Sequence, residues 1–340
     1  MKFRYYVARR IIAMLIVLLG VSLITFSITR IVPSDPARLW VGTRATEWQI
    51  DQARHELGLD QPTHVQYYIY LDDLLHGDLG VSMHSRRPVV EDIRDYFPAT
   101  FELTNLAMIL AVAIGLPLGI ISATKRDTKT DHAVRVFSLW GVSMPVFWLG
   151  LLLQLLFSST LHILPTTGRI DSFVNLQSPL RTITGMYTVD SLLTGNFLVF
   201  VSTLQHMIMP AFALSYSSLV IITRITRSSM LEVLRQDYIK TARSKGLAER
   251  TVIYKHALKN AMIPTTTVVG LTYGFLLGGS VLIESIFDWP GIGLYAVGST
   301  LLIDYPAIMG VTLLLALVYS VVNLIVDILY AFLDPRIRYG

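Results

Sequence analysis

The feature that most constrains this chain is a set of six long stretches that contain no Asp, Glu, Lys or Arg. They cover residues 11–29, 103–124, 136–168, 191–223, 260–283 and 305–326, and they are 19 to 33 residues long. An α-helix needs about 20 mainly apolar residues to cross about 30 Å of hydrocarbon. Each stretch is therefore long enough for one crossing and too short for two. We predict an all-α membrane protein with six transmembrane helices.

The composition supports a membrane protein and excludes several kinds of site. Hydrophobic residues make up 53% of the 340 positions, the mean hydropathy is +0.54, and charged residues make up 15%, whereas a soluble domain carries about 25%. The first stretch, 11–29, is longer than the apolar core of a cleaved signal peptide, which is about 7–15 residues, so we expect a retained first helix. The sequence has no cysteine, which excludes disulfides, thiolate metal ligands and cysteine nucleophiles.

The distribution of Lys and Arg predicts the orientation of the chain. Nineteen of the 28 basic residues fall before the first stretch, between the second and third, between the fourth and fifth, and after the sixth, whereas the intervening loops hold eight. Basic loops remain in the cytoplasm, so both termini are predicted to be cytoplasmic, in a multi-pass protein of the cytoplasmic (inner) membrane. The net charge of +4 is then a property of the inner face. It implies contacts with membrane lipid and no nucleic-acid partner.

These loops suggest a division of the chain into three parts. Residues 1–31 form the N-terminal tail and first helix, 32–100 an extracytoplasmic helical segment, and 101–340 a five-helix core that includes a cytoplasmic loop at 224–264. In the outer segment, Thr46 and Gln49 have capping-box spacing, and a helix begun there should stop at Gly58. A second helix should run from Thr63 to Leu75. Residues 165–195 are expected to form an irregular outer loop.

The cytoplasmic loop 224–264 has more structure than a basic patch on anionic lipid requires. We predict a helix from Ser229 to Lys245 that ends at Gly246, because glycine best adopts the left-handed conformation after a helix. A second helix from about Ala248 should return the chain to the membrane at Pro264.

The chain resembles the permease subunits of binding-protein-dependent ABC importers, and among them the oligopeptide, dipeptide and nickel type. The matching segments follow the family order along nearly the whole chain: Asp35-Pro36, residues 56–60 with Pro62, 77–80 with Ser82, 237–247, 256–261 with Pro264, 284–293, and 334–338. The subgroup pattern in the cytoplasmic loop is similar to Asp237–Leu247. The resemblance implies the type I importer permease fold.

In that family, two homologous permeases form one translocation path, two cytoplasmic ATP-binding subunits dock on their inner loops, and an extracytoplasmic binding protein delivers the solute. The resemblance assigns the ATPase-coupling role to Lys240, Thr241, Ala242, Arg243, Lys245, Gly246 and Leu247. We expect Ala242 to lie in a cleft of the ATPase, with Lys240, Arg243 and Lys245 free to meet an acidic rim. A family signature after the fifth span consists of Glu284, Phe287, Trp289, Pro290, Gly291 and Gly293.

The expected function is ATP-driven import of di- or oligopeptides by a subunit that is not itself an enzyme. No G-x4-G-K-[ST] motif occurs, so ATP and Mg²⁺ would be bound by partner subunits, and the chain itself is expected to hold no cofactor or metal. Oligosaccharides and nickel are alternative solutes, and the substrate-binding residues are unknown. An ion-coupled secondary transporter is the alternative class. It fits less well because Glu102, Glu284, Asp304 and Asp327 all flank the uncharged stretches, and such carriers commonly need a buried acid.

The charge distribution generates a topology prediction. Single cysteines introduced at Ser85 and Ser244 should react with a membrane-impermeant thiol reagent from opposite sides, with Ser85 labelled from outside. Labelling of both positions from the same side of intact cells would contradict the six-span arrangement.

Overall fold

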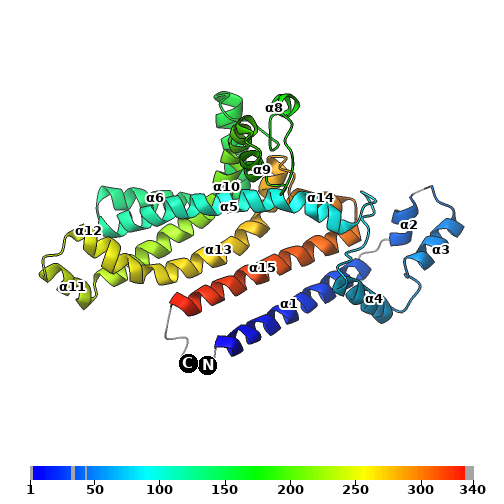
Figure 1. Cartoon of the computed structure of the whole chain (residues 1–340), viewed down its shortest axis with the longest axis horizontal. Coiled ribbons are helices and arrows are strands. Elements are labelled where there is room, and N and C mark those ends of the chain that lie inside the picture. Colours follow the sequence, from blue (N-terminus) through cyan, green and yellow to red (C-terminus); the bar gives the residue numbers. More distant parts are fainter. Residues whose placement is uncertain (1–2, 32–34, 43, 334–340) are drawn as a thin grey trace.

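The computed structural model describes residues 3–31, 35–42 and 44–333, and the regular structure in these ranges is helical (Figure 1). The terminal motif 334–338 lies outside them. The helices are α1 (Phe3–Ile31), α2 (Pro36–Val41), α3 (Glu47–Glu56), α4 (Thr63–Leu75), α5 (Val89–Thr124), α6 (Lys129–Ser143), α7 (Val146–Leu153), the π-helix η1 (Gln154–Thr160), α8 (Ser172–Gln177), α9 (Tyr187–Leu193), α10 (Phe197–Leu234), α11 (Asp237–Ser244), α12 (Glu249–Thr251), the π-helix η2 (Val252–Ala257), α13 (Leu258–Ile286), α14 (Ile292–Leu301) and α15 (Tyr305–Leu333).

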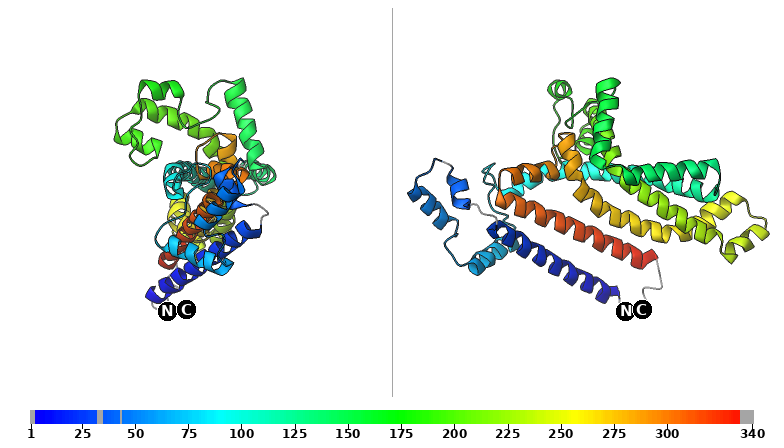
Figure 2. Two further views of the ribbon diagram at one scale, coloured as in Figure 1. Left: turned by 90° about the vertical axis from the view of Figure 1, so that its right-hand side faces the viewer. Right: turned by 180° about the vertical axis from the view of Figure 1, so that it is seen from behind.

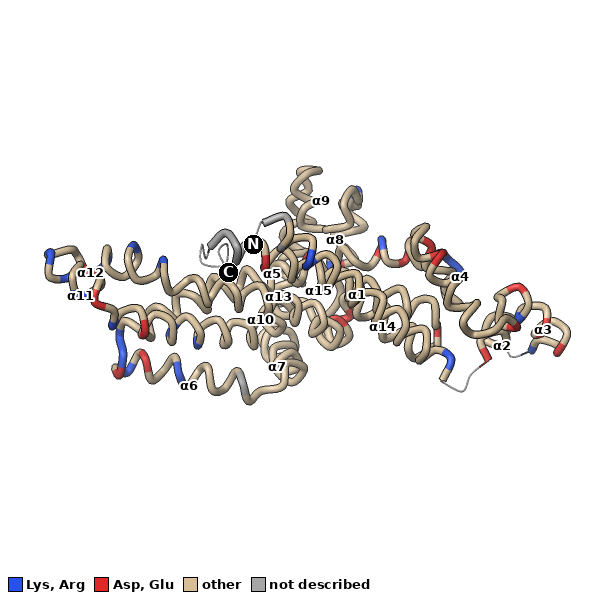
Figure 3. Tube along the Cα trace, turned by 90° about the horizontal axis from the view of Figure 1, so that it is seen from below, with Lys and Arg blue, Asp and Glu red and all other residues tan. Residues whose placement is uncertain are grey.

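Five helices are long and apolar enough to cross a membrane, and a sixth crossing is available as a bent pair. The five are Val7–Ile31, Val89–Thr124, Phe197–Leu234, Glu249–Ile286 and Tyr305–Ile328, and the pair is Lys129–Gly141 with Val146–Thr160. The five helices and the bent pair each overlap one of the six uncharged stretches of the sequence. The predicted all-α membrane fold is therefore confirmed, with five crossings, or six if the bent pair forms one. Seen from below, charged residues gather toward the two ends of the long helices (Figure 3).

The bent pair turns by 103° between α6 and α7, and Pro145 explains the position of the bend. Proline disfavours the helical conformation in the residue before it, and Met144 is extended, with φ −93° and ψ 121°. Proline also begins a helix well, because the first turn needs no donor from it, and Pro145 immediately precedes α7. As a result, α7 and η1 turn away from α6 (Figure 2).

Helices α5 and α10 form the centre of the bundle. Their backbones approach closely at Gly115 and Gly119: a Cβ atom at Gly119 would lie 2.6 Å from the Cβ of Thr226, and one at Gly115 would lie 2.8 Å from the carbonyl oxygen of Leu219. Small residues at this spacing permit close helix packing in membranes. Gly115 and Gly119, four residues apart, form such a contact between α5 and α10.

The segment between α1 and α5 has the predicted helices. The Thr46 amide donates to Gln49 Oε1 at 2.8 Å, and the Gln49 amide donates to Thr46 Oγ1 at 3.4 Å, which completes the capping box of α3. Gly58 follows α3 with φ +62°, a conformation that favours glycine. Helix α4 has the expected bounds, Thr63–Leu75. Helix α5, however, begins at Val89 and continues through position 100. Acidic residues in its first turn, Glu91 and Asp92, favour a helix start there because they interact well with the helix dipole.

The α5–α10 contact generates a stability prediction. Replacement of Gly119 by alanine should lower stability by about 1–3 kcal/mol, because the added methyl group overlaps Thr226 and a backbone oxygen. The matched control is Gly278→Ala in α13, where nothing lies within 4 Å of the added Cβ. Melting temperatures of the purified chains in detergent measure both effects. Equal melting temperatures for the two variants would show that the helices do not meet as described.

Candidate coupling site and the polar contacts that hold it

The loop between α10 and α13 contains a short helix, α11, and its predicted bounds were partly wrong. We expected one helix over Ser229–Lys245, but α10 ends at Leu234 and α11 begins at Asp237. Met230 and Ile239 explain the break, because both are fully buried in one apolar cluster. These two residues are nine positions apart, and on one continuous helix their side chains would point in opposite directions. The predicted end at Gly246 is correct, and its φ is +76°.

One face of α11 is covered by the chain's own residues. Ile239 and Ala242 are buried against Val252, Ala257 and Ala261, at the beginning of the helical segment that becomes α13. Ala242 therefore does not offer its side chain to a partner, and the expectation that it lies in an ATPase cleft needs correction. The helix is amphipathic, and an alanine three residues after a buried isoleucine shares its face.

The opposite face of α11 is exposed. The predicted coupling residues that are exposed are Lys240, Thr241 and Arg243 in α11, and Lys245, Gly246 and Leu247 directly after it.

Two of the basic residues that we expected to be free have acidic partners in the same loop. Lys240 Nζ lies 2.8 Å from Asp237 Oδ1, and this hydrogen bond lowers the pKa of Asp237. Arg243 donates to both carboxylate oxygens of Glu249, at 3.1 and 2.6 Å, which raises the pKa of Arg243. The second pair joins α11 to α12. The exposed face thus carries both signs of charge and is not purely basic.

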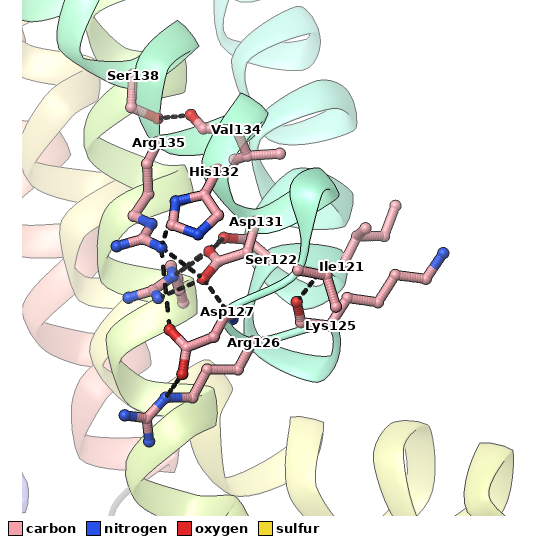
Figure 4. A network of polar contacts seen from close by, with 12 residues as sticks. Ile121, Ser122, Lys125, Arg126, Asp127, Asp131, His132, Val134, Arg135 and Ser138 are labelled. Atoms are coloured by element: carbon pink, nitrogen blue, oxygen red, sulfur yellow. Dashed lines mark hydrogen bonds and ion pairs between the residues drawn. The ribbon is translucent and has the colours of Figure 1, made fainter.

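A buried carboxylate, Asp131, ties together the helices that lead to this loop (Figure 4). Its side chain is fully covered and lies in the first turn of α6. Arg227 of α10 donates to both of its oxygens, at 2.9 and 3.0 Å, and Ser122 of α5 donates at 2.5 Å. Arg135 adds an ion pair at 3.3 Å. A charge can be buried at low cost only when such partners surround it, so α5, α6 and α10 are held together at this point.

The signature residues within 284–293 form a second buried polar cluster, against the N-terminal half of α5. Glu284 accepts hydrogen bonds from the Gly293 amide at 2.7 Å, from the Leu294 amide at 3.1 Å and from Thr100 Oγ1 at 2.7 Å. The indole of Trp289 donates to the carbonyl oxygen of Ala99 at 3.0 Å.

The remaining signature residues fit around this carboxylate. Phe287 and Trp289 are buried and Pro290 is half-buried. Gly291 and Gly293 leave room for the carboxylate, since Cβ atoms there would lie 2.5 and 2.8 Å from Glu284 Oε2. The structure therefore brings all six signature residues together.

Our statement that the membrane spans lack buried carboxylates is wrong. Glu284 lies inside α13 with no exposed surface, and Glu102 lies buried in α5. Both helices extend beyond the uncharged stretches, so residues that flank a stretch in the sequence remain helical and covered. Arg169 pairs with Glu102 at 2.6 Å, and the Thr188 amide and hydroxyl each donate to Glu102 at 2.6 Å.

Arg169 comes from the loop that we expected to be irregular, which contains α8 and α9. Its guanidinium also lies over the ring of Tyr187, 3.7 Å from the centroid. Sequence spacing gave no signal for these partners, because they lie 67 and 86 residues from Glu102.

These contacts position helices and do not resemble a catalytic centre. The fold and the exposed α11 face define a multi-pass membrane protein with a structured loop between its fourth and fifth crossings. The chain belongs to the family of binding-protein-dependent transport system inner membrane components. The family model matches residues 115–339, and the model of the N-terminal part of such components matches residues 2–104.

Curated relatives match over the full length. The probable D,D-dipeptide transport system permease protein DdpB of Escherichia coli (strain K12) is 47% identical over 340 residues, which is 100% of this chain and 99% of the relative. The dipeptide transport system permease protein DppB of Alkalihalophilus pseudofirmus is 45% identical over 98% of this chain and 99% of its own. The glutathione transport system permease protein GsiC of Salmonella typhi is 41% identical over the same shares.

The Asp131 contacts generate a prediction about stability. Asp131→Asn should lower the free energy of unfolding by about 1.5–3 kcal/mol, because it removes the charge that two arginines and a serine satisfy. Asp127→Asn is the matched control: it lies in the same turn, its side chain is 67% exposed, and exposed ion pairs contribute about 0–1 kcal/mol. Thermal unfolding in detergent compares the two. A loss in Asp127→Asn as large as that in Asp131→Asn would contradict the central role of the buried carboxylate.

Proposed function

We propose that this chain is one permease subunit of an ATP-driven importer that moves di- or oligopeptides across the cytoplasmic membrane. The family match and the names of the relatives support this proposal: those relatives are permeases of dipeptide, D,D-dipeptide and glutathione transport systems. The matches extend over nearly the whole of each chain, so the comparison covers both the membrane core and the outer segment.

In this proposal the chain works in a complex. A second homologous permease completes the path, two ATP-binding subunits hold ATP and Mg²⁺, and an extracytoplasmic binding protein delivers the peptide. Both termini and the loop 224–264 lie in the cytoplasm, and the α2–α4 segment lies outside. The excess of basic residues on the proposed inner side supports this orientation. The ion pair of Arg10 in α1 with Asp327 in α15, at 3.0 Å, is consistent with both ends lying on one side.

The observation that carries the proposal is the construction of α11. It is a short helix whose apolar face is fixed to the chain's own core, while the opposite face is exposed. Such a helix is suited to docking, because its position is set before the partner binds and little ordering cost remains. We propose that the exposed face of α11 contacts an ATP-binding subunit, with Thr241 near the centre of the contact.

This assignment of α11 is tested by Thr241→Arg. Thr241 is exposed, so the change should leave the fold intact, whereas a bulky charge at the docking face should weaken binding of the ATP-binding subunits by on the order of tenfold, or about 1.4 kcal/mol. Co-purification of those subunits and ATP-dependent peptide uptake in proteoliposomes should both fall. The control is Thr63→Arg, an equally exposed threonine in the outer segment. Normal uptake and normal ATPase retention in Thr241→Arg would remove α11 from the docking surface.

A further inference from the structure

A cavity of about 700 Å³ lies between the outer end of α1, the α2–α4 segment and the start of α15. This volume is within the range of about 300–1,000 Å³ that small-molecule sites occupy. None of the residues that line this cavity comes from α5, α10 or α11. The cavity is therefore separate from the polar clusters around Asp131 and Glu284 and from the proposed coupling helix. Its role is independent of the function proposed above.

The apolar part of the cavity is rich in aromatic rings. Phe26, Trp40, Tyr70 and Tyr305 line it, and the rings of Phe26 and Tyr70 stack with centroids 5.8 Å apart. The uncharged stretch of α1 ends one residue before Arg30, so the cavity lies where hydrocarbon gives way to lipid headgroups. Aromatic side chains favour this depth in membrane proteins.

The polar part of the cavity carries both signs of charge. The Arg30 guanidinium lies 4.8 Å from the centroid of the Phe26 ring. Glu56, Asp73 and Asp78 also line the cavity, and all three are exposed. The lining thus offers a guanidinium and three carboxylates.

Gln66 contributes an acceptor that the described residues leave unused. Its amide nitrogen donates to the carbonyl oxygens of Leu59 at 3.2 Å and Gln61 at 2.7 Å. These two bonds fix the orientation of the amide, because a flipped group would place oxygen against oxygen. The Oε1 atom is buried and has no hydrogen-bond partner among the described parts of the chain. A buried acceptor without a donor is costly, so a ligand with an N–H group fits here.

Two exposed leucines of α1, Leu19 and Leu23, form an apolar track on the side of the cavity that leads along α1 away from Arg30. Leu19 and Leu23 lie on the same face of α1 as Phe26 and Arg30, since the spacings of four, three and four residues follow one stripe. Both are accessible, with 57% and 47% of their surfaces exposed. An acyl chain can lie along them while the headgroup occupies the cavity.

We propose that this cavity binds a membrane phospholipid with a primary ammonium headgroup, of the phosphatidylethanolamine class. Its phosphate pairs with Arg30, its ammonium donates to Gln66 Oε1 and faces the carboxylates, and one acyl chain follows Leu23 and Leu19. A guanidinium is well suited to phosphate. A peptide also carries both charges, but its backbone would meet no polar partners along the apolar track.

The acceptor at Gln66 makes the proposal specific. A quaternary ammonium, as in phosphatidylcholine, has no N–H to donate, and phosphatidylglycerol has no cation for the carboxylates. The purified full chain is therefore incubated with equal amounts of these three lipids, with identical acyl chains, and the retained lipid is identified by native mass spectrometry. We expect one phosphatidylethanolamine per chain, and we expect Arg30→Ala to reduce its retention about tenfold or more.

Three further variants complete the test. Gln66→Leu should abolish the preference for phosphatidylethanolamine over phosphatidylcholine, and Val65→Phe, which fills the cavity without a change of charge, should reduce retention of every lipid. Arg38→Ala is the matched control, because Arg38 is an exposed arginine of α2 that pairs with Glu47 and does not line the cavity. Equal retention of the three lipids by the unaltered chain would overturn the proposal, as would unchanged retention in Arg30→Ala and Val65→Phe. Displacement of the lipid by a dipeptide would identify the cavity as a peptide site instead.

Discussion

The rest of the structure depends on the close approach of α5 and α10 at Gly115 and Gly119. Side chains at these two positions would overlap the backbone of α10, so the helices can meet only because glycine has none. Thr223 reinforces the contact, since its hydroxyl donates to the carbonyl oxygen of Gly115 at 3.1 Å. In lipid, the hydrophobic effect does not drive helices together. Close packing and hydrogen bonds of this kind therefore provide the free energy of helix association. The other long helices, and the buried polar clusters around Asp131 and Glu284, are positioned relative to this pair.

The buried carboxylates near the two ends of the α5–α10 pair have different kinds of partner. Nearer the N-terminal end of α5, Glu284 is surrounded mainly by backbone amides and a threonine hydroxyl, whereas Glu102 has an arginine partner. At the C-terminal end of α5, Asp131 is shared by two arginines and a serine. In each case the carboxylate joins segments that are far apart in the sequence. A buried polar cluster of this kind fixes one arrangement of helices, because a different arrangement would leave a buried charge without partners.

Local signals in the sequence predicted much of the fold. Uncharged stretches located the crossings, Thr46 and Gln49 predicted the start of α3, and Gly246 predicted the end of α11, because each of these depends on a single segment. The break between Leu234 and Asp237 was not predicted, since it arises from the joint burial of Met230 and Ile239 against residues of η2 and α13. The partners of Asp131 and Glu284 could not be found for the same reason: no local pattern relates Arg227 to Asp131 or Thr100 to Glu284. The seven predicted coupling residues form one segment of the sequence, but only the tertiary contacts of Ala242 show which face of α11 is free.

The break after α10 also determines how a movement of α11 can reach the membrane. The segment between Leu234 and Asp237 is not helical, so α11 can tilt relative to α10 without bending a continuous helix. Its buried face, in contrast, contacts Val252 and Ala257, and these belong to the helical stretch Glu249–Ile286 that carries Glu284 at its far end. A force applied to α11 by a docked subunit, as in the proposed function, is therefore transmitted more directly to α13 than to α10. Helix α10 is fixed to α5 and, through Arg227, to Asp131 of α6. We therefore expect α13 to move while the α5–α10 pair remains stationary, and we expect this displacement to end at the polar contacts around Glu284.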